Sequence, residues 1–394
     1  MGQPANDYRD DACAAGRAAA AGADRYARAL AAWLAPADIR LDGKRRWDIL
    51  VRDARAPREI LQRGSLGAGE AYMRGWWDSP ALDECVCRIL RAGLGGRLAS
   101  LRAAWLGWGA WLGNPQRRAR AFAIGRAHYD LGNDLFEAML DRRMVYSCGY
   151  WPGAADLDEA QAQKLALVCE KLELVPGQRL LDIGCGWGSL CEFAARNYGV
   201  AATGLTVSRR QYELASARCD GLPVQIRLQD YRAIGNESYD RVASIGMFEH
   251  VGVRNYPRYF DVVRRCLGPD GLFLLHTIGR NSSTRSVDPW IERYIFPRGQ
   301  LPSLRQVSAA LEGRFVVEDL HNFGIDYDAT LLAWYRRFDA AWPGLAGRYD
   351  EVFRRMWTFY LLGCAGAFRA RDMQVWQFVL SSRGLAGGYR RPRW

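Results

Sequence analysis

The run RLLDIGCGWG, from Arg179 to Gly188, has residue types and a spacing that could hold a nucleotide. Its apolar first half predicts a strand. Gly184, Gly186 and Gly188 then allow the backbone to approach a ligand closely, in conformations that a side chain would forbid. A helix beginning near Trp187 would point the positive end of its dipole at the same place. The run therefore predicts a nucleotide-binding turn between a strand and a helix.

The spacing of the glycines narrows the class of nucleotide. A dinucleotide fingerprint needs the pattern G-x-G-x-x-G, but Ser189 stands where its last glycine belongs. The turn instead resembles the first motif of the S-adenosylmethionine-dependent methyltransferases, and this resemblance implies S-adenosylmethionine as the cosubstrate. The alternative is a tight turn in another kind of α/β domain.

Four further strands are predicted downstream, with helix-length segments between most of them. They cover residues 200–205, 224–228, 241–246 and 272–275. Alternating strands and helices indicate an α/β fold built on a doubly wound, mostly parallel, Rossmann-like sheet. Ligands bind beyond the carboxyl ends of the strands in such sheets, so the polar residues just past each strand are candidates for the site.

Polar residues follow the second and third of these strands. Thr206 and Gln211 suit the ribose and amino-acid end of the cosubstrate. Gln229 and Asp230 suit its adenine amino group. Singly, each is more often a helix cap or a surface group, but as a set at successive strand ends they predict a binding site. The predicted cosubstrate site consists of Asp182, Gly184, Gly186, Gly188, Thr206, Gln211, Gln229 and Asp230.

Length and composition add a second domain to this core. With 394 residues the chain is too long for one methyltransferase core, and 49% hydrophobic residues can bury a sizeable interior. We see neither a secretory signal nor an apolar run long enough to cross a bilayer, so we expect a cytoplasmic protein that meets a membrane only at its surface. The ten cysteines are scattered and indicate reduced thiols, and the four histidines have no metal-binding spacing.

The net charge of +11 is concentrated in one segment. Residues 85–129 contain eight arginines and no Asp or Glu, which predicts an anionic partner, either phospholipid headgroups or nucleic acid. Trp105, Trp108 and Trp111 lie three residues apart in the same segment and favour a membrane surface. Alternatively, the arginines form an ordinary solvated face and the tryptophans pack in the core.

A break at Asn114-Pro115, followed by Arg117, Arg118 and Arg120, predicts the domain boundary. We expect a smaller, mainly helical N-terminal accessory domain that binds lipid over residues 1–113. A linker then covers residues 114–122, and the catalytic domain covers residues 123–394.

Five motifs carry a more specific resemblance, and they are similar to those of the bacterial cyclopropane-fatty-acyl-phospholipid synthases. These enzymes belong to the mycolic acid cyclopropane synthase-like methyltransferases. Residues 64–77 and 364–372 resemble the same family, so the likeness covers nearly the whole chain. The five motifs are HYDLGNDLF (128–136), YSCGYW (146–151), MFEHVG (247–252), HTIG (276–279) and NFGIDY (322–327).

The resemblance implies that a methylene group is added across the cis double bond of an unsaturated acyl chain in a membrane phospholipid. Methyl transfer to the alkene leaves a carbocation, which the pocket must shield from water until a base removes a proton and the ring closes. The family also implies a homodimer, peripheral to the inner face of the membrane. We expect no nucleic-acid partner.

In this family the base is a bound bicarbonate. The residues that hold it correspond to Cys148, Glu249, His276, Ile278 and Tyr327, with Ile278 donating its backbone N–H, Glu249 accepting from the bicarbonate hydroxyl, and His276 and Tyr327 donating to the anion. Tyr146 and Ser147 would lie by the methionine carboxylate of the cosubstrate. Cys364, in the C-terminal motif, is a further candidate, as a reactive or structural thiol near the site.

Two rival functions remain open at this point. A related lipid methyltransferase would stop after methylation and give branched or hydroxylated acyl chains. A non-catalytic protein would use the same scaffold to bind lipid or nucleic acid. The sequence Met247-Phe248-Glu249-His250 stands where amino-group methyltransferases of nucleic-acid bases carry Asn/Asp-Pro-Pro-Tyr/Phe, which argues against methylation of a base.

Overall fold

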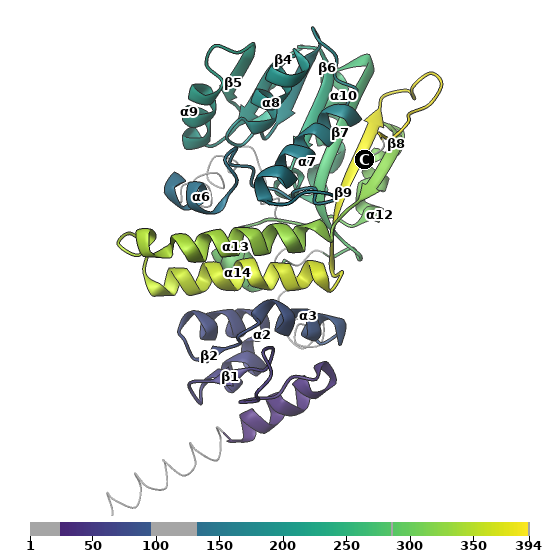
Figure 1. Cartoon of the computed structure of the whole chain (residues 1–394). Coiled ribbons are helices and arrows are strands. Elements are labelled where there is room, and N and C mark those ends of the chain that lie inside the picture. The colour runs from purple at the N-terminus through teal and green to yellow at the C-terminus, as the bar shows by residue number, and fades with distance from the viewer. Residues whose placement is uncertain (1–23, 96–131, 285–286, 393–394) are drawn as a thin grey trace, which may run out of the picture. The chain divides into compact units, whose positions relative to one another are not determined.

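A computed structural model of the protein describes residues 24–95, 132–284 and 287–392 (Figure 1). The chain forms two compact units. The first unit contains the N-terminal residues together with 288–290 and 349–370, and the second contains the remainder of the chain. Residues 96–129 of the basic segment, which carry its three tryptophans and the predicted linker at 114–122, lie outside the described residues, so the membrane contact and the linker remain predictions.

The first unit is mainly helical. Residues 24–34 are helical and run into the short helix η1 (Ala35–Ala37). The helices α2 (Ala56–Met73) and α3 (Leu82–Arg91) follow, and β1 (Leu50–Val51) pairs antiparallel with β2 (Trp77–Asp78). The third long helix, α14 (Glu351–Arg369), comes from near the other end of the chain and packs against α2 and α3.

Close packing explains why α14 belongs to the first unit although the sequence assigned it to the catalytic domain at 123–394. A Cβ atom on Gly366 would lie 2.3 Å from the carbonyl oxygen of Asp83, so only glycine allows this approach of α14 to α3. Arg369 adds an ion pair of 2.7 Å to Asp83, and Arg355 donates to the Asp78 carboxylate at 2.6 Å. A division of the chain at a single linker therefore does not describe the two units.

The second unit is built on a seven-stranded sheet with the order β5-β4-β3-β6-β7-β9-β8. The strands from β5 to β7 are mutually parallel, whereas β9 is antiparallel to both of its neighbours. The doubly wound, mostly parallel sheet predicted from the sequence is confirmed, and its five predicted strands are present. The strands are β3 (Arg179–Ile183), β4 (Ala201–Thr206), β5 (Val224–Leu228), β6 (Tyr239–Ile245), β7 (Leu267–Arg280), β8 (Val316–Asn322) and β9 (Met373–Ser381).

Helices cover both faces of this sheet (Figure 1). Contacts join α8 and α9 to β4 and β5, and join α10 to β7 and α12. The side chains of the central strands are buried on both faces of the sheet. These strands therefore lack the alternation of polar and apolar residues that is typical of a half-exposed sheet. The helices of this unit are α6 (Asn133–Met139), α7 (Leu157–Lys171), α8 (Ser189–Tyr198), α9 (Arg209–Arg218), α10 (Tyr256–Cys266), α12 (Leu304–Leu311) and α13 (Asp326–Leu345), with short turns η3 (Tyr231–Ala233), η4 (Phe248–His250) and η5 (Val253–Asn255); α11 (Pro289–Tyr294) begins in the first unit and ends in the second.

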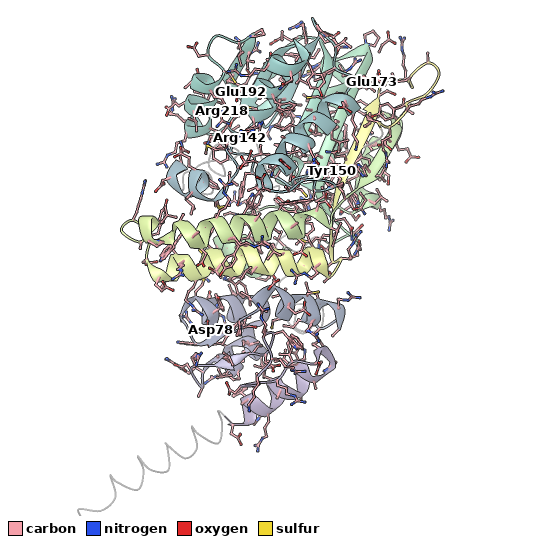
Figure 2. All side chains as sticks on the ribbon, in the orientation of Figure 1. Asp78, Arg142, Tyr150, Glu173, Glu192 and Arg218 are labelled. Atoms are coloured by element: carbon pink, nitrogen blue, oxygen red, sulfur yellow. The ribbon has the colours of Figure 1, made fainter. Side chains whose placement is uncertain are left out.

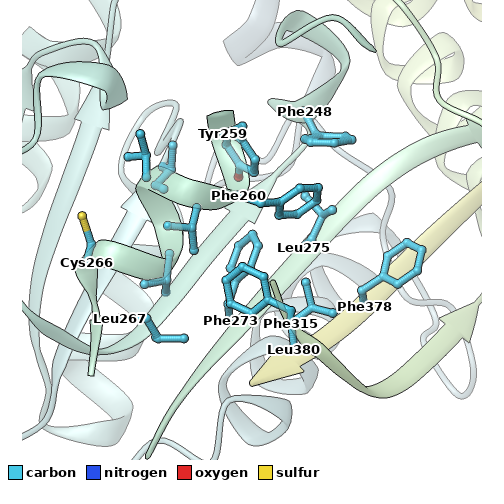
Figure 3. Close-up of a cluster of buried hydrophobic side chains, with 14 of the residues drawn as sticks. Phe248, Tyr259, Phe260, Cys266, Leu267, Phe273, Leu275, Phe315, Phe378 and Leu380 are labelled. Atoms are coloured by element: carbon cyan, nitrogen blue, oxygen red, sulfur yellow. The ribbon is translucent and has the colours of Figure 1, made fainter. Parts of the chain in front are cut away.

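Each face of the sheet has its own apolar core. Phe273 and Leu275 of β7 point to one face, where aromatic rings of α10, η4 and the segment before β8 pack closely (Figure 3). The ring centroids of Phe260 and Phe273 are 6.4 Å apart. Leu272 and Leu274 point to the opposite face, which packs against α7 and α8. Because side chains alternate between the two faces along each strand, both faces of the sheet are packed. This packing holds the ends of the strands in place.

Within the described residues, no helix is both long and apolar enough to span a bilayer.

Candidate active site

The glycine-rich turn has the conformation that its sequence predicts. Gly184, Gly186 and Gly188 have φ angles of +90°, +54° and +82°, which residues other than glycine rarely adopt. The turn connects β3 to α8, which starts at Ser189, two residues later than expected, with Gly188 as its N-cap. No atom lies within 4 Å of the position that a Cβ on Gly186 would take, so its backbone is open to a ligand.

A cavity of about 190 Å³ lies against this turn and against the ends of β3, β4 and β6. It is lined by nine of the ten residues predicted to bind the cosubstrate, and Gly188, the tenth, caps α8 instead. The structure therefore brings together residues from four separate parts of the chain. The nine are Tyr146, Ser147, Asp182, Gly184, Gly186, Thr206, Gln211, Gln229 and Asp230.

Asp182 has the most unusual environment of these nine. Its side chain is 3% exposed, and burial raises the pKa of the carboxyl to about 7. The Oδ1 atom has no hydrogen-bond partner, although buried polar atoms are nearly always paired. An unpaired acceptor in the wall of a cavity fits a ligand that brings a donor, such as a ribose hydroxyl or an ammonium group.

The other polar side chains are already tied to neighbours. The Thr206 hydroxyl donates to Gln211 Oε1 at 2.9 Å, which joins the end of β4 to the first turn of α9. Arg232 donates to both carboxylate oxygens of Asp230, at 2.8 and 2.6 Å. Each carboxylate oxygen has two lone pairs, so Asp230 can still accept a further hydrogen bond from an adenine amino group.

The loop that carries Tyr146 and Ser147 is held by α7. Gln161 donates to the Ser147 carbonyl at 2.8 Å, and Lys164 donates to its hydroxyl at 2.9 Å. Both side chains are buried, and burial lowers the pKa of Lys164 to about 8. Lys164 also lines the cavity and was missed by sequence reasoning. The available signal was a lysine between the apolar residues Leu165 and Val168 and the alanine at 160 of a helix, in a chain with only three lysines.

The start of the same loop is tied to α8 and α9. Arg218 donates to the Arg143 carbonyl and, at 3.3 Å, to the Ser189 hydroxyl, and its Nε lies 3.7 Å from Glu192. Figure 2 shows Arg218 and Glu192 together in this region of the second unit. The Ser189 hydroxyl, at the first turn of α8, thus contacts both the Arg143 carbonyl of the loop and Arg218 of α9.

Glu249 lies in η4, after β6, and is one of the five residues predicted to hold bicarbonate. The Ile278 backbone N–H donates to its Oε1 at 2.6 Å, whereas the buried Oε2 has no partner. Burial raises the pKa of the carboxyl to about 7. An unpaired carboxyl oxygen can accept a hydrogen bond from a ligand, and the assignment of bicarbonate as that ligand stays a prediction. The Ile278 N–H, however, contacts Glu249 in this structure, and its donation to an anion stays a prediction.

His276 and Cys148 are both buried and uncharged. His276 Nδ1 lies 3.2 Å from Gln377 Nε2, and burial lowers the pKa of the imidazole well below its ordinary value. The Cys148 thiol donates to the Gly149 carbonyl at 3.2 Å, and burial raises its pKa well above the ordinary value. The Gly149 N–H donates to Thr330 of α13 at 3.0 Å, which brings Cys148 to the helix whose first turn holds Tyr327.

Aromatic side chains connect the two groups of residues. The Tyr327 ring packs edge-on against Trp334, with centroids 5.8 Å apart, and Trp334 packs against Tyr146 at 5.1 Å. Tyr146 lines the cavity, as do Met247 and His250 beside Glu249. The five residues predicted to hold bicarbonate do not themselves line that cavity.

Cys364 belongs to a different compact unit from the other predicted site residues. It is on α14, in the first unit, and it does not line the cavity. Burial raises its pKa to about 12, so the thiol stays protonated at neutral pH and is a poor nucleophile.

Comparisons with known proteins agree with the predicted chemistry. The family model described as mycolic acid cyclopropane synthetase matches residues 116–378. The cyclopropane-fatty-acyl-phospholipid synthase of Escherichia coli (strain K12) is 52% identical over 375 residues, which cover 94% of this chain and 97% of that protein. The tuberculostearic acid methyltransferase of Mycobacterium tuberculosis is 35% identical over 356 residues, covering 83% of this chain and 81% of that protein.

Solved structures give the same result. The cyclopropane synthase MmaA2 from Mycobacterium tuberculosis has a TM-score of 0.62 and 33% identity, covering 66% of this chain and 97% of that one. The mycolic acid cyclopropane synthase CmaA1, complexed with SAH and CTAB, has a TM-score of 0.61 and 34% identity with the same coverage. The protein thus belongs to the mycolic acid cyclopropane synthetase family.

Proposed function

We propose that this enzyme is a cyclopropane-fatty-acyl-phospholipid synthase. It transfers a methylene group from S-adenosylmethionine to the cis double bond of an unsaturated acyl chain in a membrane phospholipid. The observation that carries the proposal is the 52% identity to the E. coli synthase over nearly the full length of both chains.

The cavity beside the glycine turn suits S-adenosylmethionine. Gly186 offers open backbone, and Asp182 offers an unpaired buried acceptor. The N-terminus of α8 adds a partial positive charge near the turn. When bound, the cosubstrate supplies an electrophilic methyl group on a sulfonium. The protein's task is to hold the alkene in line with that methyl group, and such positioning can lower a barrier by roughly 7–11 kcal/mol.

The residues around Glu249 suit the carbocation that follows methyl transfer. Cys148 and His276 are buried and neutral, so they exclude water without adding positive charge. With a pKa of about 7, Glu249 is partly ionised at neutral pH and supplies negative charge in a buried setting, where electrostatic interactions are strong.

Bicarbonate is the second ligand of the proposal, held by Cys148, Glu249, His276, Ile278 and Tyr327. The unpaired Oε2 of Glu249 supports it, because a bicarbonate hydroxyl would satisfy that oxygen. When bound, bicarbonate supplies the base that takes a proton from the transferred methyl group. By accepting this hydrogen bond, Glu249 fixes which oxygen of bicarbonate carries the proton.

The basic, tryptophan-bearing segment of residues 85–129 is proposed to bind the anionic inner face of the membrane. The absence of Asp and Glu leaves its eight arginines as net positive charge for that surface, with Arg88 already paired with Glu84 of α3 at 2.9 Å. We also propose that the enzyme works as a homodimer at this surface, with unsaturated phospholipid and not nucleic acid as its partner.

One assay tests this function. The purified enzyme is given S-adenosylmethionine and vesicles of phospholipid with cis-unsaturated chains, and S-adenosylhomocysteine release is followed with and without bicarbonate. Vesicles of fully saturated phospholipid are the control. Gas chromatography of the fatty acids identifies the product. Ring-containing chains support the proposal. Methyl-branched or hydroxylated chains would instead support the related lipid methyltransferase activity, and no release with either lipid would overturn both.

A further inference from the structure

Lys171, the last residue of α7, is an ammonium group in the interior of the second unit. Its side chain is fully buried. Its Nζ lies 2.7 Å from Gln377 Oε1 and 2.9 Å from His321 Nδ1, and within the described residues it pairs with no carboxylate. Burial of an ammonium without a counter-ion is costly, and it lowers the pKa of Lys171 to about 7. Such a group is retained where it does something that an apolar residue could not.

Three adjacent strands bring the partners of Lys171 into one row. In the register of the sheet, Gln377 of β9 stands opposite His276 of β7 on one side and opposite His321 of β8 on the other. Directly opposed residues on neighbouring strands have side chains in contact. The Gln377 side chain is therefore between the imidazole of the predicted bicarbonate site and the lysine of α7.

Hydrogen-bond chemistry fixes the direction of this row. Lys171 Nζ donates to Gln377 Oε1, so the amide oxygen faces Lys171; below pH 7 the amine is protonated and can only donate. The amide nitrogen Nε2 then faces His276 Nδ1 at 3.2 Å, and an amide nitrogen also only donates. His276 Nδ1 must accept, and because the buried ring is neutral, its one proton is on Nε2. With the amide reversed, the Gln377 nitrogen and the Lys171 ammonium would be two donors facing each other.

We propose that Lys171 and Gln377 are positioning residues that hold His276 as the Nε2–H tautomer, so that this ring presents a hydrogen-bond donor, and not an acceptor, to the anion of the proposed bicarbonate site. The part about the anion rests on the proposed function, whereas the tautomer follows from the contacts among Lys171, Gln377 and His276 alone. Phe323, whose ring centroid is 5.6 Å from that of His276, packs edge-on against it and restricts its rotation.

The decisive variant is Gln377→Glu, which keeps the size of the side chain. A carboxylate accepts from both sides, so it still takes a hydrogen bond from Lys171 but requires a proton on His276 Nδ1. The tautomer should invert and leave Nε2 as an acceptor. Nitrogen NMR of protein labelled only in its histidines reads this directly, since the chain has four histidines and the His276→Gln variant assigns the signal by its loss.

We expect the unsubstituted enzyme to show His276 protonated at Nε2 alone, and Gln377→Glu to show it protonated at Nδ1. Turnover at fixed bicarbonate should fall at least about tenfold, because a donor to the anion is lost, while the affinity for S-adenosylhomocysteine stays unchanged. Lys171→Met should leave a mixture of tautomers. The matched control is Tyr389→Phe, which removes the hydrogen bond of 3.1 Å to the Lys171 backbone carbonyl and leaves the ammonium alone. Its spectrum and turnover should be those of the unsubstituted enzyme.

Two results would overturn the inference: a proton on His276 Nδ1 in the unsubstituted enzyme, or an Nε2–H tautomer that persists in Gln377→Glu. Inverted protonation with full bicarbonate-dependent turnover would show that His276 does not donate to the anion. The spectra are recorded without substrate, so a failure of the proposed function appears separately, as an unsubstituted enzyme with the expected spectrum and no bicarbonate-dependent ring formation.

Discussion

The substitution Glu249→Gln should remove a loss of stability that the unsubstituted enzyme undergoes as the pH rises through 7, while abolishing ring formation. In the fold the carboxyl keeps its proton up to a pKa of about 7, whereas its ordinary pKa is 4.5. Between these values the folded state binds more protons than the unfolded state. Stability from this group is therefore complete below pH 4.5 and is lost as the pH rises through 7. Glutamine does not titrate, so the variant lacks this loss.

The size of the effect follows from proton linkage. With the two pKa values above, the unsubstituted enzyme loses about 2.5 kcal/mol more than the variant between pH 5 and pH 8. The amide of glutamine leaves a buried donor without a partner, at a cost of about 1–3 kcal/mol that is the same at both pH values. The quantity to measure is therefore the change with pH of the difference in unfolding free energy between the variant and the unsubstituted enzyme, because the constant cost cancels in that change.

Urea unfolding of both proteins at pH 5 and pH 8, in buffer freed of carbon dioxide, measures this difference. Glu213→Gln, an exposed site on α9, is the control and should show no such pH dependence. Added bicarbonate should stabilise the unsubstituted enzyme and not Glu249→Gln. A stability difference that is flat with pH would refute a buried, easily protonated Glu249. Unchanged turnover of the variant in bicarbonate would refute its role in catalysis.

Three further outcomes are expected. Lys164→Met should weaken S-adenosylhomocysteine binding at least about tenfold by calorimetry, because the buried donor that holds the cavity loop is lost; Lys44→Met, at an exposed site, should not. Cys364→Ala should keep turnover within about twofold, since a thiol with a pKa of about 12 is no nucleophile at neutral pH; a loss of turnover without loss of stability would contradict this. Replacement of the three arginines at 117, 118 and 120 by glutamine should weaken binding to anionic vesicles by roughly 1 kcal/mol per charge at low salt, an effect that added salt should mimic; unchanged salt-dependent binding in a sedimentation assay would rule the contact out.

The sequence predicted the five parallel strands of the sheet and nine of the residues that line the cavity because both depend on local pattern. A buried parallel strand is a short apolar run, and a nucleotide turn is a cluster of glycines. The strands β8 and β9 were missed for a different reason. At the exposed edge of the sheet, β8 carries Glu318, Asp319 and His321 among its apolar residues, so its pattern resembles a surface loop. Its pairing with β9 joins segments more than fifty residues apart, which no local pattern records.

The interior lysines could not be predicted from residue type, because lysine is almost never fully buried. On α7, Gln161, Lys164 and Lys171 are nevertheless buried among apolar neighbours such as Val168. Their spacings of three and seven residues correspond to one and two helical turns, so one face of one helix carries all three. Gln161 and Lys164 hold the loop at the cosubstrate cavity, and Lys171 reaches the strand that faces His276. A shift of this helix by one residue would therefore disturb the cosubstrate loop and the row of residues at His276 together.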